Sequence, residues 1–121
     1  MKRVLLVDDV PGIRRSVAYV LRAAGYEVQE AENGSLAKQR LQEGRYDLVL
    51  TDMIMPECDG GEVINWLIDQ PSRPAIVAMS GGGGYSTAEQ TLDIARSKAD
   101  ALLMKPFMRQ QLLETVEQAM H

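Results

Sequence analysis

The sequence switches repeatedly between two spacings of apolar residues, and this alternation limits the folds open to the chain. Nearly unbroken apolar runs occupy residues 4–7, 47–51 and 75–79, as expected for strands buried on both faces. Residues 26–29 alternate between apolar and polar, which indicates a strand with one face in water, and residues 101–104 form a short last run. The pattern therefore predicts five strands.

Each predicted strand is followed by a segment whose apolar residues recur at helical spacing. The first covers residues 13–24, at i, i+4, i+7, i+8 and i+11, with Pro11 suited to its start and Gly25 to its end. In the second, Asn33 is a candidate cap and Gly44 a candidate end. Three further helices are predicted around these apolar residues: 63–68, 88–95, with the weakest pattern, and 112–120.

Five alternating strand–helix units predict an α/β fold, (βα)5, with a parallel sheet and helices on both faces. The apolar strands at 4–7, 47–51 and 75–79 should be central, and the half-polar strand at 26–29 should lie at an edge. The order 2-1-3-4-5, the flavodoxin-like order, satisfies both requirements. The chain has 121 residues, the size of one domain, so a single domain is expected over residues 1–121.

Composition excludes several classes of function. The formal net charge of −4 argues against direct binding of nucleic acid, whose partners are normally basic. Cys58 is the only cysteine and His121 the only histidine, so a disulfide, a cysteine-based metal site and a zinc-hydrolase motif are all excluded. A single cysteine fits a reduced, cytoplasmic compartment. No apolar run approaches the ~20 residues of a membrane span, so no membrane partner is expected.

Polar residues stand at the carboxyl ends of four of the predicted strands. Asp8 and Asp9 follow the first strand, Asp52 the third, Ser80 the fourth and Lys105 the fifth. These four strands are neighbours in the predicted order, and sites in open parallel sheets lie beyond the carboxyl ends of the strands. The five side chains are therefore expected to converge. Taken singly, each could be an ordinary turn, cap or surface residue.

Three neighbouring carboxylates repel one another, and a hard divalent cation such as Mg²⁺ relieves that repulsion. A carboxylate can also act as a nucleophile toward phosphorus and form an aspartyl phosphate. A metal, an ammonium group and a hydroxyl can neutralise the charge on the transferring oxygens. The set of side chains therefore predicts a phosphoryl-transfer site.

Four segments together resemble the receiver domain of bacterial two-component response regulators, and the resemblance covers essentially residues 1–120. They are Val-Leu-Leu-Val-Asp-Asp at 4–9, the run from Tyr46 through Thr-Asp-Met-Ile-Met-Pro to Gly60, Met-Ser at 79–80 and Lys-Pro-Phe at 105–107. The resemblance implies a cytoplasmic signalling switch, not a conventional enzyme, in which Asp52 accepts a phosphoryl group from a sensor histidine kinase or a histidine phosphotransfer protein. The switch would then change its partner-binding surface, and the downstream protein partner is not predicted.

The resemblance also assigns the ligands of Mg²⁺. Asp9 and Asp52 would bind the metal directly, the backbone carbonyl of Ile54 would be the third protein ligand, and Asp8 would act through water.

The phosphoryl group itself would be contacted by Ser80 and Lys105. The Lys105–Pro106 bond is expected to be cis, so that the turn aims the lysine back over the sheet edge.

Two features depart from the family pattern. Leu102 stands three residues before Lys105, where the family often has an aromatic switch residue. Gly81, Gly82, Gly83 and Gly84 follow Ser80 directly, where the family has few glycines, and they match no phosphate-binding motif. We therefore expect Leu102 and the four glycines to be the switch candidates, with signalling carried by ordering of residues 81–95.

Three alternatives remain open from the sequence. The chain could be a receiver domain from a larger regulator or a hybrid kinase. A flavin-binding domain shares the topology, but Asp8 and Asp9 would repel phosphate where the flavin phosphate binds. A phosphohydrolase with an aspartate nucleophile would need a second aspartate where Ile54 stands.

Overall fold

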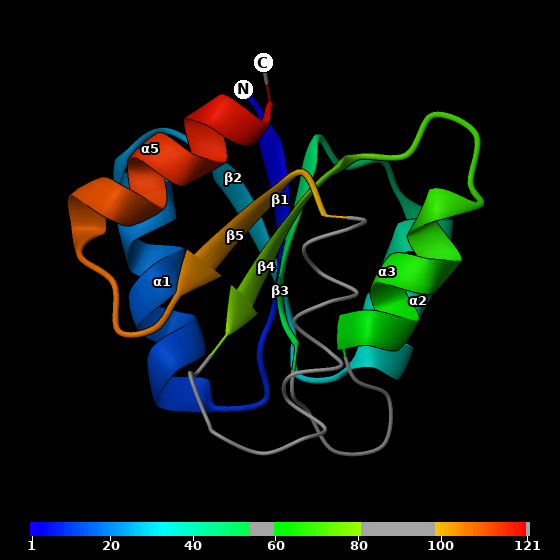
Figure 1. Cartoon of the computed structure of the whole chain (residues 1–121), viewed down its shortest axis with the longest axis horizontal. Helices are drawn as coiled ribbons and strands as arrows, with labels where there is room; N and C mark the ends of the chain where they lie inside the picture. The colour runs from blue at the N-terminus through cyan, green and yellow to red at the C-terminus, as the bar shows by residue number, and fades with distance from the viewer. Residues whose placement is uncertain (54–59, 81–98, 121) are drawn as a thin grey trace.

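A computed structural model describes residues 1–53, 60–80 and 99–120 and contains the predicted parallel sheet (Figure 1). All four strand pairs are parallel, and the order is β2-β1-β3-β4-β5, as predicted. The strands are β1 Arg3–Val7, β2 Glu27–Ala31, β3 Leu48–Asp52, β4 Ala75–Ser80 and β5 Ala101–Met104.

Helices cover both faces of the sheet, with α1 and α5 on one face and α2 and α3 on the other (Figure 1). The predicted helix at 88–95 lies outside the described residues. The bounds of the four described helices are α1 Pro11–Ala23, α2 Gly34–Glu43, α3 Gly60–Ile68 and α5 Arg109–Ala119.

Local signals account for the helix ends. Pro11 is the first residue of α1, where its missing N–H costs nothing. Gly25, just beyond that helix, has φ of 99°, a left-handed conformation that glycine adopts most easily. The Asn33 side chain accepts a hydrogen bond of 2.8 Å from the backbone N–H of Leu36, which caps α2.

Alternate residues of each central strand pack into two separate hydrophobic cores, one on each face of the sheet. In β1, Leu5 and Val7 pack with the buried residues of α2 and α3, whereas Val4 and Leu6 pack with those of α1 and α5. All four are fully buried. Burial on both faces explains the unbroken apolar runs of β1, β3 and β4, because neither face can be polar.

The strand bounds differ from the expected ones by about one residue. Asp52 and Ser80 are the last residues of β3 and β4 and do not merely follow them, while β2 begins at Glu27 and not at Tyr26. Asp52 remains in the sheet because it pairs with Met79 of β4. The edge position predicted for β2 is confirmed.

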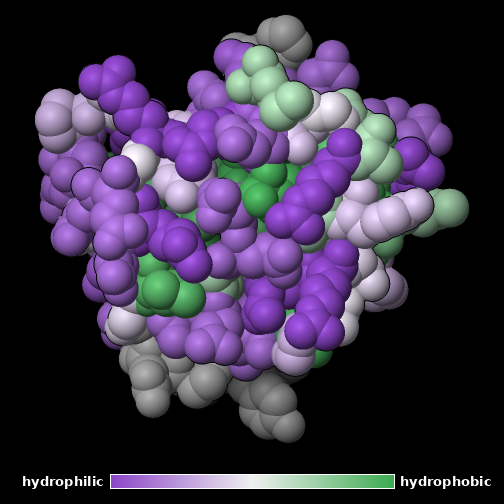
Figure 2. Space-filling model, turned by 180° about the vertical axis from the view of Figure 1, so that it is seen from behind, coloured by the Kyte–Doolittle hydropathy of each residue, from purple (hydrophilic) through white to green (hydrophobic). Residues whose placement is uncertain are grey.

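Seen from behind, on the side away from β5, the surface is mostly hydrophilic, with small separate apolar areas (Figure 2). The edge strand β2 contributes Glu27, Gln29 and Glu30 to the polar surface of the fold. Every helix within residues 1–53, 60–80 and 99–120 is too short or too polar to span a lipid bilayer.

Candidate functional site

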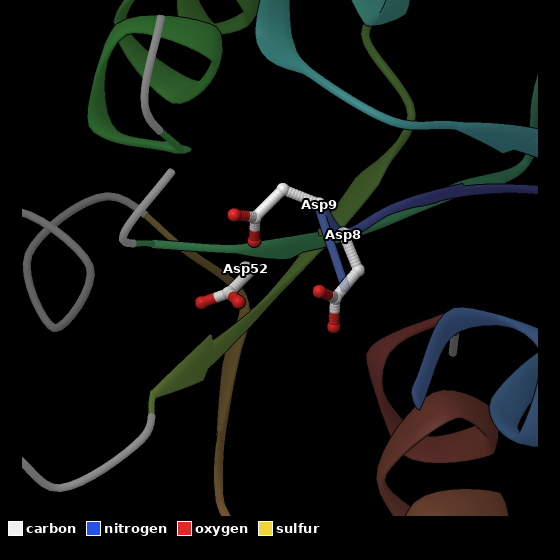
Figure 3. Close-up of side chains that lie close together, drawn as sticks. All are labelled: Asp8, Asp9 and Asp52. Atoms are coloured by element: carbon white, nitrogen blue, oxygen red, sulfur yellow. The ribbon is translucent and has the colours of Figure 1, made fainter. Parts of the chain in front are cut away.

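Three aspartates gather at the carboxyl edge of the sheet (Figure 3). Asp8 and Asp9 come directly after β1, and Asp52 ends β3, the neighbouring strand. One carboxylate oxygen from each residue lies within 4.8 Å of the others. The sheet order thus brings together side chains that are more than forty residues apart in the sequence, as predicted.

The three carboxylates differ in burial. Asp8 is fully buried, Asp52 is 7% exposed and Asp9 is partly exposed. Burial makes like-charge repulsion stronger than in bulk water, because the effective dielectric constant is lower. The cluster therefore gains from any cation that can reach all three groups.

The chain itself supplies a cation that reaches two of the three carboxylates. The Lys105 Nζ donates hydrogen bonds of 3.1 Å to Asp8 Oδ2 and of 3.1 Å to Asp52 Oδ2. Burial lowers the pKa of Lys105, whereas the Asp52 and Asp8 carboxylates raise it, and the net result is a pKa above the usual lysine value. Lys105 is therefore a cation shared between two carboxylates.

The backbone holds Lys105 at the site. Its N–H donates a hydrogen bond of 2.7 Å to the carbonyl of Ser80, which ties the residue after β5 to the end of β4. The Lys105–Pro106 bond is cis, as predicted.

Asp8 and Asp9 are adjacent but have different surroundings. Asp8 Oδ1 accepts a 2.9 Å hydrogen bond from the backbone N–H of Val10, and Asp8 Oδ2 contacts Lys105. Asp9 makes no hydrogen bond or ion pair with any residue in the described part of the chain. The Asp9 carboxylate is thus the one that keeps its oxygens available for a ligand.

Of the other predicted site residues, Ser80 is buried at the end of β4, next to β3. Leu102 is partly buried in β5 and packs against the core on the α2 and α3 side. Ile54 and the glycines at 81–84 lie outside the described residues, so their predicted roles as metal ligand and switch stay predictions.

Comparison with known protein families matches residues 4–117 to the response regulator receiver domain. The chain belongs to this family. The flavin-binding and phosphohydrolase alternatives are thereby set aside. Receiver domains are signalling modules of two-component systems that histidine kinases phosphorylate, and they are not conventional enzymes.

Relatives of this receiver domain include proteins that it covers almost from end to end. It is 33% identical over 117 residues to the response regulator receiver protein CpdR of Brucella abortus, covering 97% of this chain and 95% of CpdR. It is 31% identical over 120 residues to the chemotaxis protein CheY of Bacillus subtilis, covering 98% of each chain.

A solved structure of similar fold is the response regulator protein TrrA of Thermotoga maritima, crystallised in complex with Mg²⁺-BeF. The TM-score is 0.84 and the sequence identity is 34%, and the alignment covers 98% of this chain and 99% of TrrA.

The acidic cluster of this receiver domain is consistent with a Mg²⁺ site. The donor set of Asp8, Asp9 and Asp52 consists of carboxylate oxygens, the ligands that hard divalent cations prefer. The three clustered carboxylates also supply negative charge, which favours the binding of a cation. One of them, Asp9, has no polar partner within the described residues. Phosphorylation-dependent signalling is typical of the family.

Sequence reasoning missed Arg14, which contacts the acidic loop from α1. Its NH1 donates a 2.9 Å hydrogen bond to the backbone carbonyl of Asp8. No sequence pattern pointed to Arg14, because arginines on the polar side of a helix usually lie in solvent. The only hint was its place in the first turns of the helix that follows Asp9.

Proposed function

We propose that this receiver domain is a signalling switch that accepts a phosphoryl group on Asp52 from a histidine kinase or a histidine phosphotransfer protein. The observation that carries the proposal is that the Asp52 carboxylate clusters with Asp8 and Asp9 and also accepts a hydrogen bond from the Lys105 ammonium. Of these three aspartates, only Asp52 lies in a strand, whereas Asp8 and Asp9 follow β1.

In this reaction an oxygen of the Asp52 carboxylate attacks phosphorus and forms the new O–P bond. The N–P bond to the donor imidazole breaks, and its electron pair returns to that nitrogen, which is then protonated. Mg²⁺ held by the acidic cluster would supply positive charge that offsets the negative charge of the transferring phosphoryl group. Because the carboxylate is converted to an acyl phosphate, one negative charge on Asp52 is replaced by the charge of the phosphoryl group.

The chain's own residues divide the remaining work. The Lys105 ammonium, 3.1 Å from Asp52 Oδ2, would donate a hydrogen bond to a phosphoryl oxygen once Asp52 is phosphorylated. Ser80, at the end of the next strand, would donate its hydroxyl to another. Asp9 and Asp52 would hold the metal with the Ile54 carbonyl, and Asp8, whose oxygens are occupied by Lys105 and the Val10 N–H, would act through water.

Phosphorylation is proposed to change a partner-binding surface that includes Leu102 and residues 81–95. Leu102 is an aliphatic side chain packed against the core, so a ring rotation is not available to it. The reaction takes place in the cytoplasm, and the proposal holds whether residues 1–121 act alone or as part of a larger regulator or hybrid kinase.

Acetyl phosphate with Mg²⁺ tests the proposal. The wild-type protein should incorporate one hydroxylamine-labile phosphoryl group, located at Asp52 by peptide mapping, and amide exchange of residues 81–95 should slow in the phosphorylated sample. Asp52→Asn should abolish incorporation, whereas Asp69→Asn, a control at an exposed position beyond α3, should leave it unchanged. Undiminished incorporation in Asp52→Asn would refute the assignment.

A further inference from the structure

Arg14 joins the acidic loop to the edge strand of the sheet. Its NH1 donates a hydrogen bond of 2.9 Å to the carbonyl of Asp8, while its Nε lies 3.1 Å from Glu30 Oε1 in β2. The Arg14 side chain is only 14% exposed and that of Glu30 26% exposed. One guanidinium therefore connects α1, the loop after β1 and β2.

Glu30 is itself held from a second position on α1. Its Oε2 lies 3.5 Å from NH2 of Arg22, and that same NH2 donates a 2.9 Å hydrogen bond to the carbonyl of Val28. The Glu30 carboxylate is thus fixed from both of its oxygens, so Arg14 is anchored to a group that is not free to move away. The Arg14 guanidinium therefore approaches the Asp8 carbonyl from a fixed position.

The Asp8 carbonyl belongs to the peptide that links Asp8 to Asp9. On the other side of Asp8, its backbone N–H donates a 3.1 Å hydrogen bond to the carbonyl of Ala31. The chain is therefore held immediately before and immediately after the Asp8 side chain. The Asp8 and Asp9 side chains leave it in different directions, and the Asp9 carboxylate lies on the side of Asp52 (Figure 3).

We propose that Arg14 is a positioning residue for the cation site: by holding the Asp8–Asp9 peptide it presets the Asp9 carboxylate toward Asp52. Asp9 has no polar partner of its own among the described residues, so its direction depends on the backbone that carries it. The inference rests on the proposed function in that the cation is taken to be Mg²⁺. Arg14 touches neither the metal nor the phosphoryl group.

Charge and positioning predict opposite effects, which makes the proposal testable. Arg14 brings a positive charge near a cation site, so its removal should strengthen Mg²⁺ binding if charge alone matters. If Arg14 orients Asp9, its removal should weaken binding, because loss of a group that orients a metal ligand typically costs ~10–100-fold in affinity. The direction of the change decides between the two roles.

The experiment is a titration of the unphosphorylated protein with MgCl₂ by isothermal calorimetry. Arg14→Ala should weaken Mg²⁺ binding by roughly 10-fold. Arg14→Lys should weaken it nearly as much, since an ammonium group cannot bond the Asp8 carbonyl and Glu30 in the planar geometry of a guanidinium. Arg15→Ala is the control, because Arg15 is the exposed neighbour, has the same charge and makes no ion pair with the described residues.

Arg22→Ala removes the second contact of Glu30 but leaves that of Arg14 with the Asp8 carbonyl, so it should weaken Mg²⁺ binding less than Arg14→Ala does. The control, Arg15→Ala, should bind Mg²⁺ as the wild type does, or slightly more tightly. Arg14→Lys keeps the charge and is the variant to use if Arg14→Ala fails to fold by circular dichroism. The proposal would be overturned if Arg14→Lys bound Mg²⁺ as tightly as the wild type. It would also be overturned if Arg14→Ala bound Mg²⁺ as tightly as Arg15→Ala.

Phosphorylation supplies an independent readout. With acetyl phosphate, Arg14→Ala should need roughly 10-fold more Mg²⁺ for half-maximal labelling but reach nearly the wild-type rate at saturation. A wild type that binds Mg²⁺ but is not labelled on Asp52 would refute the proposed function and leave the role of Arg14 standing. If the wild type is labelled on Asp52 but Arg14→Ala needs no more Mg²⁺ than the wild type for half-maximal labelling, the proposed function stands and the role of Arg14 is refuted.

Discussion

The two ends of the sheet use the same kinds of charged residue in different ways. At the amino end, Arg3 Nε lies 3.0 Å from Glu27 Oε2, an ion pair without hydrogen-bond geometry, and Arg73 NH1 lies 3.0 Å from Asp100 Oδ2. These four side chains are 33% to 48% exposed. At the carboxyl end, three aspartates cluster and two of them, Asp8 and Asp52, share Lys105; the side chains of Lys105 and Asp8 are 17% and 0% exposed.

The difference lies in balance and burial. Each cation at the amino end has its own anion and water nearby, so the pairs stabilise little. At the carboxyl end three negative charges face one positive charge in a drier environment, so the excess charge is costly until a cation or a chemical change relieves it. The amino end is a structural edge, whereas the carboxyl end stores an electrostatic imbalance that a metal ion or phosphorylation can change.

The largest effect should come from removing the shared cation. Lys105→Met should lower the free energy of unfolding by about 2–3 kcal/mol in EDTA, because it removes the positive charge that both buried carboxylates, Asp8 and Asp52, contact. MgCl₂ should restore part of the loss. Urea unfolding measures both quantities. Lys2→Met, at an exposed position, is the control, and an equally small loss in the two variants would contradict the comparison.

Reducing the negative charge should have a smaller effect of opposite sign. Asp9→Asn should raise the free energy of unfolding in EDTA by about 1 kcal/mol, since one of three mutually repelling charges is removed without breaking a contact among the described residues. The same variant should lose the stabilisation by MgCl₂. Thermal unfolding with and without the metal measures both. A less stable Asp9→Asn protein in EDTA would show that the cluster is not under repulsion.

The smallest effect is expected at the amino end. Arg73→Ala should lower the free energy of unfolding by about 0.5 kcal/mol or less, because the pair is partly exposed. Asp100 would keep its 2.7 Å hydrogen bond from the Ile76 N–H. Urea unfolding in parallel with Lys105→Met provides the measurement. A loss as large as that of Lys105→Met would remove the distinction between the two ends.

The order of the strands was predictable because a strand buried on both faces has a nearly unbroken run of apolar residues. The runs at 4–7, 47–51 and 75–79 had to be central, and the half-polar strand of Tyr26 and Val28 had to be at an edge, which left few possible orders. The exact strand ends were not predictable. Asp52 and Ser80 stay in the ladder through cross-strand pairing, which a polar residue type does not reveal.

The convergence of the site residues could also be predicted, since parallel strands end at one edge. Residue type alone does not distinguish Asp8 from Asp9; the family resemblance assigned them different roles, and the structure adds a physical reason, since Asp8 is occupied by Lys105 and the Val10 N–H. Arg14 could not be predicted, because its two partners, the Asp8 carbonyl and Glu30, meet only after β1 and β2 pair.

The first residue of the chain and the end of α5 lie at the amino end of the sheet, opposite to the end that carries the three aspartates (Figure 1). A tag, a reporter or a surface linker attached at either end would therefore project away from the acidic cluster. Immobilised by either terminus, the domain presents the same face to solution. Binding experiments with kinases or phosphotransfer proteins can thus use one attachment chemistry without blocking the face that must be reached.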